Sequence, residues 1–85
     1  MRLDKFLKVS RLIKRRTLAK EVADQGRITI NSNQAKASTD VSVGDVLTIQ
    51  FGQKLLTIQV DSLQETVKKD EAANLYTVKK EEQVN

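Results

Sequence analysis

The hydrophobic periodicity of the chain changes at Gly26, and this change constrains the fold more than any other feature of the sequence. Apolar residues recur at helical spacing before Gly26, whereas they alternate with polar residues after it. In the first segment, Leu3, Phe6 and Leu7 fall on one side of a helix. Leu12 breaks this pattern, so the first helix is predicted to end near residues 10–11.

A second helix is predicted over residues 16–25. Thr17 or a neighbouring residue is expected to cap its start, and Gly26 stands where a left-handed residue commonly closes a helix. The apolar positions of this segment form one stripe, which we expect to be buried: Leu18, Ala19, Val22 and Ala23.

The alternating part of the chain predicts short strands connected by turns. The expected strands are residues 27–31, 34–38, 46–51 and 55–60. Tight turns are expected at Ser32-Asn33, at Gly44-Asp45 and at residues 52–54. Two amphipathic helices followed by turn-separated strands indicate an α+β fold.

The composition becomes strongly charged after Asp61. A short helix is predicted over residues 68–76, and residues 79–85 are expected to form a frayed end. We therefore divide the chain into a helix-and-strand domain at residues 1–62 and a C-terminal extension at residues 63–85.

Positive charge is concentrated in the two predicted helices. Residues 1–27 contain nine Lys or Arg residues against three acidic residues, a net charge of +6. The remaining residues contain six bases against eight acids, a net charge of −2, and the two parts together give the +4 of the whole chain. Such asymmetry indicates a polyanionic partner rather than an ordinary solvated helix surface.

The sequence offers little catalytic chemistry. It has no His and no Cys, so the usual general base, the thiol nucleophile and the commonest metal ligands are missing. It also lacks a phosphate-binding glycine loop, and Asp40 and Asp45 flank a turn rather than forming a catalytic pair. We therefore expect a binding module without enzymatic activity, cofactor or metal.

No apolar run is long enough to span a bilayer, and no uninterrupted apolar segment follows the basic N-terminus. A cytoplasmic protein is therefore expected. The three aromatic residues, Phe6, Phe51 and Tyr76, all fit core positions, which disfavours recognition of single strands by base stacking. Affinity should then come mainly from contacts with phosphates and from the shape of a groove.

Several motifs occur in an order that resembles the S4-type RNA-binding domain family. They are Arg2-Leu3-Asp4, then Arg16-Thr17 with Ala19, then Gly26, then Ile28, Ile30 and Asn31, and finally Gly44-Asp45. The match covers about residues 1–50. Ser32-Asn33 departs from the family pattern, which usually has a lysine after an Asn-Gly turn.

The resemblance implies a fold with two helices packed on a small bent antiparallel sheet, and an RNA-binding surface formed by the helices. Asp4, Asn31 and Asp45 are assigned structural roles, Asp4 by pairing with an arginine or capping a helix, and the other two in turns. The candidate RNA-binding residues are the bases of the helices and of the following strand and turn: Arg2, Lys5, Lys8, Arg11, Arg15, Arg16, Lys20, Arg27 and Lys36.

Most domains of this family are attached to an enzyme, whereas this chain resembles the stand-alone bacterial members. That resemblance implies binding to rRNA and peptidyl-tRNA on obstructed large ribosomal subunits, as a monomer. It further implies support for a tailing factor that adds alanines to the stalled peptide. The alternatives are a ribosome assembly or heat-shock recycling factor, a helix-turn-helix DNA regulator, which would usually dimerise, and a membrane-surface module, which would need an exposed apolar face.

Overall fold

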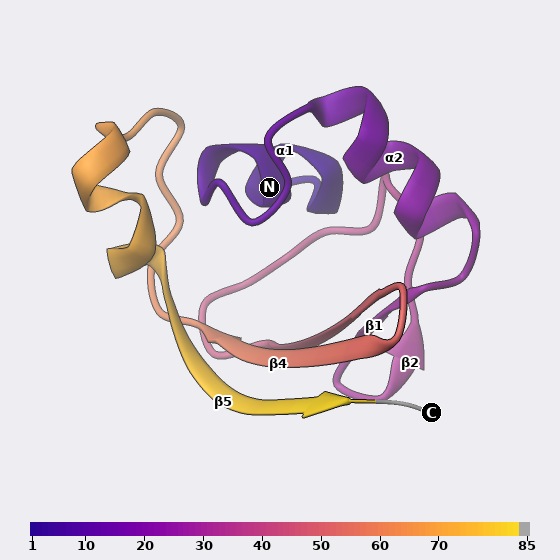
Figure 1. The fold of residues 1–85 in the computed structure, drawn as a ribbon. Coiled ribbons are helices and arrows are strands. Elements are labelled where there is room, and N and C mark those ends of the chain that lie inside the picture. Colours follow the sequence, from indigo (N-terminus) through magenta and orange to yellow (C-terminus); the bar gives the residue numbers. More distant parts are fainter. Residues whose placement is uncertain (84–85) are drawn as a thin grey trace.

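Two short helices lie on one side of a five-stranded antiparallel sheet in the computed structural model, which describes residues 1–83 (Figure 1). This arrangement confirms the predicted α+β fold class. The elements follow one another as helices α1 (Leu3–Val9) and α2 (Arg16–Asp24), strands β1 (Ile28–Ile30), β2 (Asn33–Gln34), β3 (Val46–Phe51) and β4 (Lys54–Val60), the 3-10 helix η1 (Lys69–Leu75) and strand β5 (Tyr76–Gln83). No helix of residues 1–83 is long and apolar enough to cross a membrane.

The strands are arranged in the order β2-β1-β3-β4-β5, and each neighbouring pair is antiparallel. The register is continuous between β3 and β4, where Thr48 pairs with Thr57. Between β4 and β5 it shifts at Thr57/Ile58. Such an irregularity increases the local twist and bends a sheet, and β4 and β5 curve visibly in Figure 1.

The core lies between the helices and the inner face of the sheet. Its largest fully buried side chains are Phe6, Leu3 and Leu7 from α1 and Ile28, Leu47, Ile49 and Ile58 from the strands. Helix α2 contributes through its small residues Ala19 and Ala23. The predicted stripe of α2 was wrong at Leu18, which is 49% exposed, because Ala19 and Ala23 form the buried face of the helix and Leu18 lies outside it.

The start of α2 also differs from the prediction. Its N-cap residue is Arg15, and no side chain, Thr17 included, makes a capping hydrogen bond there. Its end agrees with the prediction, because Gly26 follows the C-cap Gln25 with a φ of +78°. A β-carbon at Gly26 would also collide with the side chain of Gln34. Glycine is therefore favoured both by the positive φ and by the lack of room for a side chain.

The first hairpin turn is displaced by one residue from its predicted place. Its central residues are Asn31 and Ser32, with φ values of +51° and +72°, and Ile30 pairs with Asn33 across it. Asn accepts this left-handed conformation more readily than most residues, which explains the shift. The strand predicted over residues 34–38 is reduced to β2.

After β2 the chain turns toward the N-terminus instead of continuing the hairpin. The Leu3 amide donates to the Thr39 carbonyl at 2.8 Å, and the Asp4 amide donates to the Ala37 carbonyl at 3.1 Å. Ala35 and Ala37 are buried along this segment. The N-terminal residues are therefore held by backbone hydrogen bonds to residues 37–41.

Helix α1 ends at Val9, and its C-cap Ser10 lies where the sequence predicted the end of the helix; the next residue has an unusual backbone conformation. Arg11 has a φ of +61°, a left-handed conformation that costs a non-glycine residue about 1–2 kcal/mol. The Arg11 amide donates to the Lys8 carbonyl at 3.0 Å, and the Ile13 amide donates to the Leu7 carbonyl at 3.1 Å. Because Ile13 is buried, this turn both stops the helix and returns the chain to the core.

The frayed end predicted for residues 79–85 was wrong for the residues that the structure describes. Tyr76–Gln83 form β5, which pairs with β4 from Val60 to Lys54. Val84 and Asn85 lie outside the described residues. The predicted short helix is present as the 3-10 helix η1. The division at residues 62–63 stays a prediction, although β5 adds to the same sheet as the preceding strands.

Candidate nucleic-acid interface

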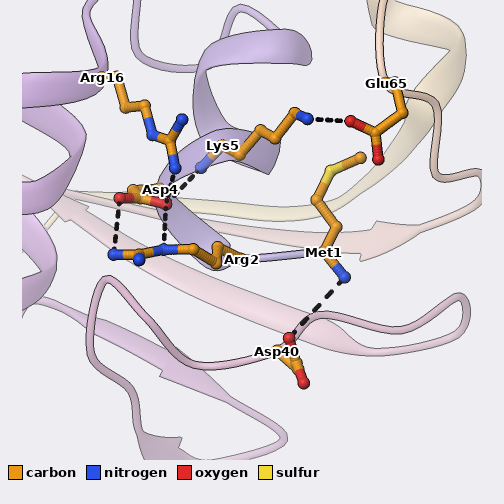
Figure 2. A network of polar contacts seen from close by, with 7 residues as sticks. All are labelled: Met1, Arg2, Asp4, Lys5, Arg16, Asp40 and Glu65. Carbon is orange, nitrogen blue, oxygen red and sulfur yellow. Dashed lines mark hydrogen bonds and ion pairs between the residues drawn. The ribbon is translucent and has the colours of Figure 1, made fainter.

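A buried carboxylate holds two arginines of the candidate site together (Figure 2). Asp4 is 3% exposed. Arg2 Nε and Arg2 Nη2 each lie 3.3 Å from an oxygen of Asp4, and Arg16 Nη2 lies 3.4 Å from Asp4 Oδ1. The Lys5 amide also donates to Oδ1 at 2.8 Å. We call Arg2, Asp4 and Arg16 the Asp4 cluster. The predicted structural role of Asp4 is confirmed.

The Asp4 cluster is positioned by three separate parts of the fold. Arg2 precedes α1 and forms an isolated β-bridge with Asp40, while Asp4 lies in the first turn of α1. Arg16 is the first residue of α2. The side chains of Arg2 and Arg16 are 50% and 49% exposed, so each guanidinium keeps donors for an external anion. The cluster carries a net charge of +1 and holds both guanidiniums in fixed places.

Burial alone would raise the pKa of the Asp4 carboxyl, but other contacts outweigh it. The hydrogen bond and charge of Arg16, the charge of Arg2 and the Lys5 amide together hold this pKa below its usual value of 3.8. Asp4 is therefore ionised at neutral pH, and its ionised form stabilises the folded chain.

The stability of the fold should consequently depend on Asp4 in acid. A carboxyl whose pKa is depressed by folding stabilises the fold above its unfolded pKa, and that stabilisation is lost as the pH falls through the folded pKa. We expect the difference in Tm between the wild type and Asp4→Asn to shrink as the pH falls below about 4. Thermal unfolding from pH 7 to pH 2 measures it, and a constant difference would contradict this account.

The other bases of this part of the chain lie on α1, on α2 and on the connection between them. Lys5 is half-buried and pairs with the carboxylate of Glu65 from the C-terminal extension (Figure 2). Lys20 lies one helical turn after Arg16 on α2, so the two share a face. Within residues 1–83, the remaining bases of the two helices and their connection are exposed and form no ion pair: Lys8, Arg11, Lys14, Arg15 and Lys20.

The last two candidate residues are placed differently. Arg27 connects α2 to β1, and Lys36 follows β2. Both are exposed, yet no hydrogen bond or ion pair of the described residues connects their side chains to the Asp4 cluster. We define the basic face as Arg2, Arg16 and the exposed bases Lys8, Arg11, Lys14, Arg15 and Lys20.

Two features of the site were missed by reasoning from the sequence. Lys14 was counted in the basic segment but was not selected, although it lines a recess of about 200 Å³ together with Lys8 and Arg11. The opposite wall comes from the C-terminal extension, through Glu65, Thr66 and Val67. We call this feature the α1 recess. Lys14 could have been selected from its neighbours in the sequence, whereas the return of residues 65–67 to α1 is a tertiary contact with no local signal.

Asn31 and Asp45 have the structural roles that were predicted. Asn31 Nδ2 donates to Asp45 Oδ1 at 3.1 Å, and the Val46 amide donates to Asn31 Oδ1 at 3.0 Å. The Ser42 amide donates to Asp45 Oδ2 at 2.8 Å. These contacts tie the first hairpin turn to the start of β3. Residues 1–83 contain no group of three or more Asp or Glu side chains able to hold a metal ion.

A small α+β fold that presents a basic face on two adjacent helices defines a protein of the nucleic-acid-binding class. The S4 domain pattern matches residues 1–47, and the chain belongs to the S4 domain family. The family predicted from the sequence is thereby confirmed.

Relatives of known name support the same assignment over nearly the whole chain. The RQC P-site tRNA stabilizing factor of Bacillus subtilis is 75% identical over 84 residues, which cover 99% of this chain and 98% of that protein. The factor of the same name from Halalkalibacterium halodurans is 67% identical over 85 residues, covering 100% and 97% of the two chains. The trimeric structure of heat shock protein 15 from Vibrio cholerae has a TM-score of 0.86 at 31% identity, covering 93% of this chain and 81% of that one.

Proposed function

We propose that this protein binds large ribosomal subunits obstructed by peptidyl-tRNA and stabilises the tRNA in the P site. The Asp4 cluster is the observation that carries the proposal. It fixes two half-exposed guanidiniums at the junction of α1 and α2, within a face that is otherwise positively charged. Fixed guanidiniums suit phosphate oxygens, because the planar fork can donate two parallel hydrogen bonds.

The comparisons favour tRNA on the ribosome over other polyanions. The name of the B. subtilis relative states P-site tRNA stabilisation, and the match covers nearly the full length of both chains. The exposed bases lie on the two helices and their connection, and no exposed aromatic platform accompanies them in residues 1–83, which suits folded RNA better than a single strand. In this proposal Arg2 and Arg16 make the main phosphate contacts. Lys5, Lys8, Arg11, Arg15, Lys20, Arg27 and Lys36 add further ones.

The finer proposal is that the bound protein supports a tailing factor that adds alanines to the stalled peptide, by stabilising the tRNA position between rounds of peptide extension. A non-enzymatic, cytoplasmic monomer without cofactor or metal would perform this role by holding an RNA arrangement in place. The second candidate is a heat-shock recycling factor, because the structure resembles heat shock protein 15 of V. cholerae over most of both chains.

Co-purification from cells tests the proposed function. Tagged wild-type protein should recover large subunits enriched in peptidyl-tRNA, and Arg16→Ala should lose most of them. Lys79→Ala is the matched control, since Lys79 is an exposed base on β5, a strand that lies apart from α1 and α2 (Figure 1). Recovery of small subunits alone, of free tRNA alone or of chromosomal DNA would reject the proposal.

Stalled peptides from cells with and without the gene separate the two candidates. Alanine tails on the stalled peptides should disappear when the gene is deleted if the protein supports tailing. Tails that persist while obstructed subunits accumulate only after heat shock would favour the recycling factor.

A further inference from the structure

The α1 recess is lined by three bases that form no ion pair within residues 1–83. Its three bases, Lys8, Arg11 and Lys14, come from α1 and the connection to α2, and each is exposed. The only acidic side chain that lines it in the described residues is Glu65, whose carboxylate is paired with Lys5. The charge of Glu65 is therefore already engaged, and the three bases line the same recess without a carboxylate partner within residues 1–83. Like charges gathered in this way disfavour folding unless an anion joins them.

Arg11 adds an independent observation. Its backbone is held in the left-handed conformation by the turn that ends α1, at a position where glycine would be free of strain. The chain places one of its longest side chains there instead. Strained residues of this kind occur preferentially at functional sites, where surrounding contacts hold them in place. No hydrogen bond or ion pair within residues 1–83 uses the Arg11 guanidinium, so no polar contact of this side chain offsets the strain of its backbone.

The extension gives the recess its shape. Residues 65–67 form one wall, and Val67 packs against the hydrophobic core, which fixes this wall in position. These residues lie outside the matched S4 pattern, which ends at residue 47. The recess therefore combines bases of the S4 part with a wall that the C-terminal extension supplies.

We propose that the α1 recess is a binding subsite for one backbone phosphate of RNA, with Arg11 as its principal ligand and Lys8 and Lys14 as supporting charges. This inference rests on the proposed function and assigns a second anchoring point beside the Asp4 cluster. The extension acts here by shaping the subsite and by keeping Glu65 on Lys5. RNA bound at both points would be fixed in orientation, because one phosphate contact alone allows rotation.

Two substitutions of Arg11 separate the roles of its side chain and its backbone. Arg11→Gln keeps the strained backbone and removes the charge, so it should weaken binding to purified large subunits carrying P-site tRNA by about tenfold. The slope of log K against log salt should become shallower by about 0.7–0.9, the share of one phosphate. Lys79→Gln on β5 is the matched control and should change neither quantity.

Arg11→Gly removes the same charge and also relieves the backbone. Binding should fall as in Arg11→Gln, whereas the Tm should rise by about 2–6 °C above the wild type, after the greater freedom of glycine in the unfolded chain is subtracted. If the Arg11 side chain served only the fold, Arg11→Gly would instead lower the Tm along with any loss of binding.

The proposal is overturned if Arg11→Gln binds with the affinity and salt slope of the wild type. It is also overturned if both variants lose stability in proportion to their loss of binding. Arg2→Ala, measured in the same assay, keeps this outcome distinct from failure of the proposed function. Loss of binding in Arg2→Ala with full binding in Arg11→Gln would reject the subsite alone, whereas a wild-type protein that does not bind these subunits would reject the function itself.

Discussion

A fourfold increase in salt concentration is expected to weaken binding of this protein to obstructed large subunits by about 50- to 150-fold. This result follows if about four phosphates are neutralised, since each contact contributes about 0.7–0.9 to the slope of log K against log salt. In the proposed binding mode, the exposed bases of the Asp4 cluster and of the α1 recess make these contacts. Aromatic stacking and buried apolar contacts would contribute little salt dependence, and residues 1–83 expose no aromatic cluster that could provide them.

Equilibrium binding at salt concentrations from 50 to 200 mM measures this slope at constant Mg²⁺. Lys79→Gln, a base removed outside the basic face, serves as the control for a general effect of net charge. A binding constant that changed less than about fivefold over this range would leave fewer than two phosphate contacts and would reject the electrostatic account.

The second large effect is expected from the Asp4 cluster. Arg2→Ala and Arg16→Ala should each weaken binding by about tenfold, and the double variant by about 100-fold, because each loses a charge-assisted contact with phosphate. Arg16→Lys should recover only part of the affinity, since an ammonium keeps the charge but lacks the planar fork.

Loss of either arginine also affects the fold, because each is a partner of the buried Asp4 carboxylate. Leaving a buried carboxylate with fewer partners destabilises a protein. Each arginine variant should therefore be compared in an Asp4→Asn background, where no buried charge remains to be compensated. A binding defect that persists there reflects a lost contact with RNA. Restored binding in that background would show that the arginines act only by neutralising Asp4.

The sequence predicted the helices well because their hydrophobic periodicity and the residues at their ends indicate the same boundaries. Gly26 takes the left-handed conformation that the end of α2 requires, and the C-cap of α1, Ser10, falls within the interval predicted for the end of that helix. The pairing of Asp4 with an arginine was also predicted, but the involvement of both Arg2 and Arg16 was not. That arrangement depends on how α1 packs against α2, which no local pattern specifies.

The errors arose where tertiary contacts outweighed local propensity. β5 was missed because its side chains are almost all exposed and half of them are charged, so it lacks the alternation by which a strand is detected. Its backbone pairs with β4 regardless. Leu18 was expected in the core because it is apolar, yet the alanines of α2 occupy that face. The candidate RNA-binding residues stay a prediction, since their roles depend on the partner.

The charge of β5 also affects how the protein behaves at high concentration. β5 is an edge of the sheet, so one side of its backbone has no neighbouring strand within residues 1–83. Open edges of this length can recruit strands from other molecules and begin aggregation. Four consecutive charged side chains, Lys79, Lys80, Glu81 and Glu82, occupy this strand. Their desolvation would oppose intermolecular pairing, so the residues that concealed the strand in the sequence also protect its edge from self-association.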